Sequence, residues 1–138
     1  MRRYVADANC EAAVDLLDAV IAADELLLDV ASAAQIVRVD FAAIGLSRDA
    51  ADDEVRAACN LQDVVLLTSD IAMKTEDALE SVLRRETDAE LPVVTFRHER
   101  VETDADLRRR VAYDLVEVLL DIETLRGTRR VWLPRTSV

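Results

Sequence analysis

One stretch decides the fold of this 138-residue chain: VVLLTSD, which runs from Val64 to Asp70. Its opening residues form an unbroken apolar, β-prone run, which predicts a strand buried on both faces. Helices are expected on either side of it, from Asp52 to Asn60 and from Ile71 to Glu86. A buried strand between two helices is typical of a parallel sheet that is covered by helices.

Four other segments have the alternation or composition of short strands: Arg2–Asp7, Gln35–Phe41, Leu91–Phe96 and Arg130–Leu133. Further helices are predicted at Asn9–Ala23 and in a long apolar stripe that starts near the capping-box-like Thr103–Asp106 and stops at Gly127. Glu25–Val30 fits either a continued helix or a strand. Because strands alternate with helices, we expect one domain, residues 1–138, with a three-layer α/β/α fold and a mainly parallel sheet.

The composition narrows the class of protein. Apolar residues make up 51% of the chain and charged residues 33%, with only 2 Gly and 2 Pro. These values exclude a disordered chain, a collagen-like chain and a disulfide scaffold. No apolar run reaches the roughly 18 residues of a membrane helix, and the start MRRYVADANCE is unlike a signal peptide. The sequence therefore predicts a soluble, cytoplasmic protein with no membrane partner.

The chain is strongly acidic, with a net charge of −11, and Lys74 is its single lysine. A protein that binds nucleic acid usually carries a positive surface, so the total charge argues against such a partner. The arginines nevertheless form clusters that could face phosphate locally, among them Arg97/Arg100 and Arg108–Arg110. For these clusters we favour solvated helix faces and ion pairs to the many carboxylates.

Few residues are available to bind a transition metal. Cys10 and Cys59 lack the spacing of a CxxC motif, and His98 is the only histidine. A zinc site of His and Cys ligands is therefore not expected, and both cysteines are predicted to be small core residues. Any metal would be held by carboxylates, which favours a hard ion such as Mg²⁺ or Mn²⁺.

Two of the predicted strands finish on aspartate, namely Asp7 and Asp70. Parallel strands end at the same edge of a sheet, so these carboxylates converge if the two strands are neighbours. Carboxylates a few ångströms apart repel each other unless a cation lies between them. A divalent ion at that position would also activate a water molecule for phosphodiester hydrolysis.

Further acids and hydroxyls are candidates for the same edge. Asp52 and Asp53 open the helix before the central strand, Ser69 precedes Asp70, and Asp77 lies two helical turns beyond it. Each aspartate also has a structural interpretation, because Asp commonly ends a strand as a turn former or caps the next helix. Taken together, the spacing favours a metal site.

Two parts of the sequence resemble the PIN-domain nucleases. Val5-Ala6-Asp7-Ala8-Asn9 is similar to their opening strand, in which the first metal-binding Asp lies in a D-x-N turn. The stretch from Gly45 to Asp70 resembles short PIN-like proteins of toxin–antitoxin type. It shows a Gly-Leu turn, an acidic helix start at Asp52–Val55 and a β-run that ends in T-x-D.

The resemblance implies a PIN-like fold and metal-dependent cleavage of RNA. Asp7, Asp52 and Asp70 would be catalytic and would hold Mg²⁺ or Mn²⁺. Further candidate residues for this site are Asn9, Asp53, Ser69 and Asp77. It also implies a role as the toxin of a toxin–antitoxin pair, with a cognate antitoxin-like protein as partner.

Two other functions stay open. The family often has an Asp-Phe pair where this chain has Ala72 and Met73. Together with the net charge, this motivates a PIN-like protein-interaction module or homodimer without catalysis, with the apolar last helix as interface. An unrelated doubly wound domain, nucleotide-binding or receiver-like, is the third possibility. Gly45 and Gly127 are the only glycines, so such a domain would lack a glycine-rich phosphate loop.

Overall fold

The structure is a computed structural model that describes residues 2–69 and 89–135. Within these residues the chain forms a five-stranded sheet in the order β2-β1-β3-β4-β5, with every neighbouring pair parallel. The strands are β1 (Arg2–Ala6), β2 (Ile36–Val39), β3 (Val64–Ser69), β4 (Val93–Phe96) and β5 (Arg130–Trp132). The five predicted strands and the α/β class are thus confirmed.

Helices connect the strands. The α-helices are α1 (Glu11–Ala23), α2 (Glu25–Ala33), α3 (Asp52–Gln62), α5 (His98–Thr103) and α6 (Ala105–Leu120). Short 3₁₀ turns are η1 (Ala8–Cys10), η2 (Ala42–Ile44) and η3 (Ile122–Leu125). The helix predicted at Ile71–Glu86 lies outside the described residues. No helix in the described part of the chain is long and apolar enough to cross a membrane.

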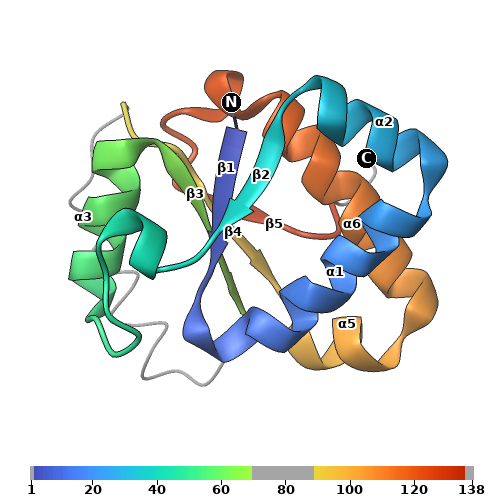
Figure 1. Cartoon of the computed structure of the whole chain (residues 1–138), viewed down its shortest axis with the longest axis horizontal. Helices are drawn as coiled ribbons and strands as arrows, with labels where there is room; N and C mark the ends of the chain where they lie inside the picture. Colours follow the sequence, from blue (N-terminus) through green and yellow to red (C-terminus); the bar gives the residue numbers. More distant parts are fainter. Residues whose placement is uncertain (1, 70–88, 136–138) are drawn as a thin grey trace.

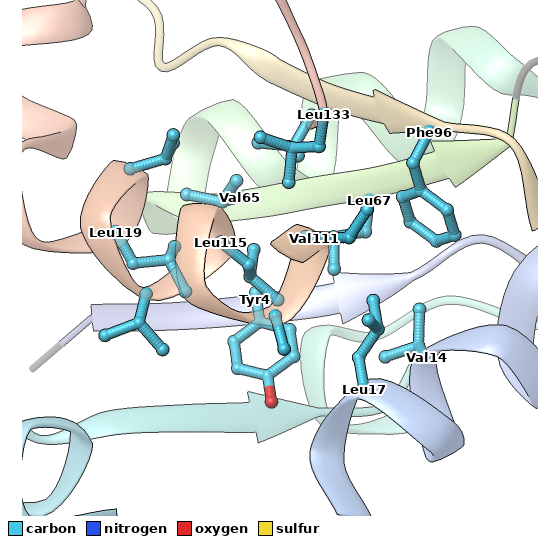
Figure 2. Packing of buried hydrophobic residues seen from close by; sticks show 14 of the residues in the cluster. Tyr4, Val14, Leu17, Val65, Leu67, Phe96, Val111, Leu115, Leu119 and Leu133 are labelled. Atoms are coloured by element: carbon cyan, nitrogen blue, oxygen red, sulfur yellow. The ribbon is translucent and has the colours of Figure 1, made fainter. Parts of the chain in front are cut away.

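The sheet is covered on both faces, as expected for a parallel sheet. Figure 1 shows α1, α2, α5 and α6 on one side of the strands and α3 with η2 on the other. Side chains of successive strand residues point to opposite faces of the sheet, so the core consists of two clusters, one on each face. Tyr4, Leu67 and Phe96 pack toward α1 and α6 (Figure 2), whereas Val5 and Leu66 pack toward Val55 and Cys59 of α3. Since both faces are covered, every residue of β3 is buried.

Two helical predictions are refined by the structure. Glu25–Val30, which the sequence left open between helix and strand, belongs to α2, whose first turn is capped by Asp24 through a 3.0 Å bond to the amide of Leu27. The last helix ends at Leu120 rather than at Gly127. Thr124 donates to the carbonyl of Asp121 from both its amide and its hydroxyl, and these bonds favour the 3₁₀ turn η3 over a continued helix.

Helix α5 was not predicted, because its six residues are too few to show a helical repeat. It is anchored by Val101, which is fully buried, and its final carbonyls accept hydrogen bonds from the guanidinium of Arg108. Asp104 then caps α6 at the amide of Leu107, one residue later than the start of the predicted capping box.

The apolar stripe of α6 was expected either to face the core or to supply an interface. In the structure its members are buried against the sheet and α1: Leu107, Val111, Leu115, Val116, Val118 and Leu119. The last helix therefore does not present this stripe to a partner, and that part of the interaction hypothesis is wrong.

Candidate active site

The site predicted from the acidic strand ends lies at the carboxyl edge of the sheet, which is the edge where all strands finish. β1 and β3 are neighbours, which is the condition on which the convergence of their end residues depends. The order 2-1-3-4-5 is one of the common orders of doubly wound sheets, and the direction in which successive strands are added reverses between β1 and β3. Ligands bind at such a reversal because the helix connections diverge there and leave a crevice.

Hydrogen bonds from its main chain and its side chain hold Asp7 in place at this edge. Its amide extends the β1–β3 ladder by donating to the carbonyl of Leu67 at 2.8 Å. Its carboxylate accepts from the amide of Ala8 at 2.8 Å and from the hydroxyl of Thr68 at 3.2 Å. The bond to Thr68 holds the side chain against the last residues of β3, so Asp7 points toward the end of the neighbouring strand.

Asp52 comes to the same edge from the opposite direction. It is the first residue of α3, which precedes β3 and runs back across the sheet, so the start of the helix lies at the carboxyl edge. Partial burial raises the pKa of its carboxyl above the ordinary value, and the negative charges of Asp7 and Asp53 raise it further. Neither Asp7 nor Asp52 forms an ion pair within the described residues.

The remaining predicted acids are placed less favourably or fall outside the described residues. Asp53 is exposed, and its carboxylate accepts a hydrogen bond from the amide of Glu54 at 3.0 Å. Asp70 and Asp77 lie outside the described residues. Among residues 2–69 and 89–135, no three acidic, His or Cys side chains are grouped closely enough to hold a metal ion. Of the three principal acids, Asp7 and Asp52 lie at the carboxyl edge, and the charge of Asp7 contributes to the raised pKa of Asp52, whereas Asp70 lies outside the described residues.

Asn9 adds an oxygen that has no partner. Its Oδ1 atom is buried in η1 without a hydrogen bond to any described residue. Buried polar atoms are nearly always paired, and an unpaired one needs an explanation such as a bound ion or ligand. Asn9 lies two residues after Asp7, so its Oδ1 atom is a candidate ligand for a cation bound at this edge.

Sequence reasoning missed the contact between Ser69 and His98. The Ser69 hydroxyl lies 2.5 Å from Nδ1 of His98 and accepts a bond from the His98 amide at 3.2 Å, and the same Nδ1 lies 3.1 Å from Glu99. A catalytic triad needs the serine and the acid on opposite ring nitrogens, so this is not one. The register of β3 and β4 brings the two residues together, because Ser69 ends β3 and pairs with Phe96 of β4, two residues before His98.

Both cysteines are buried, as predicted. Burial, together with the negative charge of Asp7, raises the pKa of the Cys10 thiol to about 12, so Cys10 is not a thiolate nucleophile at neutral pH. Its thiol instead donates to the carbonyl of Leu67 at 3.4 Å.

Comparisons of this chain with protein-family models, with curated proteins and with solved structures found no match. A fold of this class hosts many unrelated functions, so the fold alone does not define an activity. Function has to be inferred from the geometry and electrostatics of the carboxyl edge.

Proposed function

We propose that this chain is a PIN-like, metal-dependent ribonuclease that hydrolyses phosphodiester bonds of RNA. Asp7, Asp52 and Asp70 are the proposed ligands of a Mg²⁺ or Mn²⁺ ion. One observation carries the proposal: Asp7 and Asp52 both lie at the carboxyl edge, the charge of Asp7 contributes to the raised pKa of Asp52, and neither acid forms an ion pair with a described arginine or histidine. Such a pair is unfavourable by itself and becomes favourable when a cation binds.

The donor atoms at this edge suit a hard divalent ion. Carboxylate and amide oxygens are the ligands that Mg²⁺ and Mn²⁺ prefer, and Asp7, Asp52 and the unpaired Oδ1 of Asn9 are of this type. Asp70 directly follows Ser69, the last residue of β3. It is included among the proposed ligands because of this position in the sequence. A bound divalent ion would supply a water molecule of lowered pKa, the nucleophile for hydrolysis.

The surrounding residues contribute by positioning these ligands. The Thr68 hydroxyl orients the Asp7 carboxylate. The contact between Ser69 and His98 ties the end of β3 to the start of α5, beside the proposed ligands. Partners that orient a ligand in this way usually change metal affinity by about 10- to 100-fold when they are removed.

The proposal is tested by RNA cleavage with MnCl₂ or with EDTA, together with Mn²⁺ calorimetry on the same samples. We expect cleavage only with the metal, and we expect Asp7→Asn and Asp70→Asn to abolish both cleavage and the heat of binding. Asp63→Asn is the matched control. Asp63 is an acid at the opposite end of β3 with φ 52°, a conformation that Asn tolerates, and its loss should leave both signals unchanged.

Equal heats of Mn²⁺ binding for the wild type and Asp70→Asn would remove Asp70 from the site. Loss of signal in Asp7→Asn counts only if its circular dichroism and melting temperature match those of the wild type. Metal-independent cleavage that survives Asp7→Asn would overturn the proposal.

The second candidate function is an interaction module without catalysis, which binds an antitoxin-like protein or a second copy of the chain. One observation favours it: Leu26 and Leu28 of α2 are 63% and 43% exposed, and α2 leads into β2, which is an edge strand of the sheet that residues 2–69 and 89–135 form. Exposed apolar side chains beside an unpaired strand edge are typical of docking surfaces. Sedimentation of the wild type and Leu26→Ser/Leu28→Ser tests it, and RNA cleavage that Asp7→Ala abolishes would contradict it.

A further inference from the structure

A second polar surface lies further along the carboxyl edge, at the ends of β4 and β5. It is a pocket of about 400 Å³, which is within the range of ligand sites. Arg97, which directly follows β4, lines it together with Arg100 of α5, Arg110 of α6 and Trp132 of β5. Its apolar lining includes buried residues of α5 and α6, so the pocket is built on the rigid core.

The fold concentrates positive charge in this pocket. In the sequence, Arg97/Arg100 and Arg110 belong to separate arginine clusters, for which we favoured solvated helix faces. In the structure they line one concavity, and none of its described lining residues is acidic. Arg100 and Arg110 form no ion pair with a described carboxylate. In a chain of net charge −11, a basic concavity of this kind is an anion site by its local chemistry.

Trp132 gives the pocket an aromatic wall. Its side chain is 49% exposed although tryptophan is among the most apolar residues, and the guanidinium of Arg130 lies 5.3 Å from its ring centre. Aromatic rings that stand beside arginines are how proteins bind single-stranded nucleic acid: bases stack on the ring and phosphates contact the guanidinium groups. An acidic peptide would need the arginines but would gain little from the ring.

We propose that this pocket binds single-stranded RNA, with a base stacked on Trp132 and flanking phosphates held by Arg97, Arg100 and Arg110. Binding in this pocket needs no metal and stands apart from the proposed cleavage. Its use as a positioning site does rest on the proposed function. β5 is three strands from β1, about 14 Å at the usual strand spacing, and α5 lies at the same end of the molecule as the start of α1 (Figure 1). A few nucleotides would span that distance to Asp7.

The single tryptophan makes binding directly measurable. A short fluorophore-labelled oligouridylate is titrated in EDTA and followed by anisotropy, and an unlabelled one by the fluorescence of Trp132. We expect quenching of Trp132, and a slope of log K against log salt of about −2, because each phosphate contact on a single strand contributes about −0.7. Arg100→Ala/Arg110→Ala should reduce the slope to about −0.7. Trp132→Ala should weaken binding about tenfold, and Trp132→Phe should restore most of it.

Arg109→Ala is the matched control. Arg109 neighbours Arg110 on α6 but lines a different pocket with Asp24 and Tyr113, so its loss should leave the oligouridylate affinity nearly unchanged. Circular dichroism checks that each variant is folded. Equal binding of polyglutamate and oligouridylate would overturn the stacking part of the proposal, and absence of Trp132 quenching or an equal effect of Arg109→Ala would overturn it as a whole.

The test separates this site from the catalytic proposal. Oligouridylate binding in EDTA without any later cleavage supports the pocket and counts against the ribonuclease. Cleavage with no change of affinity in the arginine variants supports the ribonuclease and overturns the pocket.

Discussion

Two groups of charged residues, at opposite edges of the sheet, differ in whether their charges are paired. At the amino edge, where the strands begin, Arg126 contacts Glu123 at 2.5 Å and Asp63 at 3.2 Å and donates to the carbonyl of Ala89 at 2.7 Å. At the carboxyl edge, Asp7 and Asp52 are two like charges, and neither pairs with a described cation. Arg126, Glu123 and Asp63 are thus paired with one another, whereas Asp7 and Asp52 are not, although Glu11 at the same edge pairs with Arg48 at 2.8 Å.

This difference bears on the proposed metal site. Paired charges contribute modestly to stability and require no ligand. Like charges held together by the fold lower stability until a cation binds, so they persist where binding is selected. Substitutions that change the charge at one edge can therefore be compared with matched substitutions elsewhere in the chain.

The largest effect is expected from a third carboxylate at the carboxyl edge. Thr68 is buried and bonded to Asp7, so Thr68→Asp places an uncompensated charge beside an existing one. We expect a loss of about 3 kcal/mol or more in the free energy of unfolding at neutral pH. Urea unfolding measures this loss, and millimolar MnCl₂ should recover part of it.

Thr95→Asp is the matched variant for this prediction. Thr95 is the register partner of Thr68 on β4 and is equally buried, but its hydroxyl accepts a 3.1 Å bond from Arg130. A carboxylate there gains a cationic neighbour, so it should cost about 1–2 kcal/mol less than Thr68→Asp. Equal losses for the two variants would show that burial alone, and not the charge of Asp7, governs the carboxyl edge.

Much of this fold is predictable from local pattern. The unbroken apolar run of β3 indicates burial on both faces, and β1, α1 and α6 are long enough to show their periodicity. α5 is not predictable in this way, because it is a single short turn set by Val101 and by the guanidinium of Arg108. Its existence depends on contacts with α6 that only the folded chain provides.

The candidate site likewise has a part that local sequence pattern predicts and a part that it does not. Strand ends and the helix start placed Asp7 and Asp52 at one edge, because the topology of parallel strands fixes which ends meet. The contact of Ser69 with His98 and the pocket around Trp132 depend on side chains from different strands and helices. No spacing within one segment encodes such contacts, so sequence reasoning treated His98 and Arg110 separately.

A smaller effect is expected at the amino edge. Arg126→Ala removes two partly exposed ion pairs and one bond to a backbone carbonyl, and should cost about 1 kcal/mol. The loss should shrink as NaCl rises, because salt screens the ion pairs. Arg48→Ala, which breaks the exposed pair with Glu11, should change the free energy of unfolding by less than about 0.5 kcal/mol. If the two variants cost the same, the amino edge is not a stabilising network.

The smallest effect is expected at Asp52. The sign of its pH dependence follows from the linkage between proton binding and the free energy of unfolding. The pKa of Asp52 is raised in the folded state, so between the ordinary and the raised pKa the folded chain binds more protons than the unfolded chain. The contribution of Asp52 to stability therefore falls as pH rises through this window. Asp52→Asn lacks that loss and should gain up to about 0.5 kcal/mol over the wild type at neutral pH, and less near pH 4.

Asp53→Asn controls for the helix start, since it removes an exposed acid from the same first turn of α3. Its difference from the wild type should vary less with pH than that of Asp52→Asn. Urea unfolding of the three proteins between about pH 4 and pH 8 spans the window above the ordinary pKa. A constant difference between Asp52→Asn and the wild type across this range would show that Asp7 does not act on Asp52, and the contrast between the two edges would then disappear.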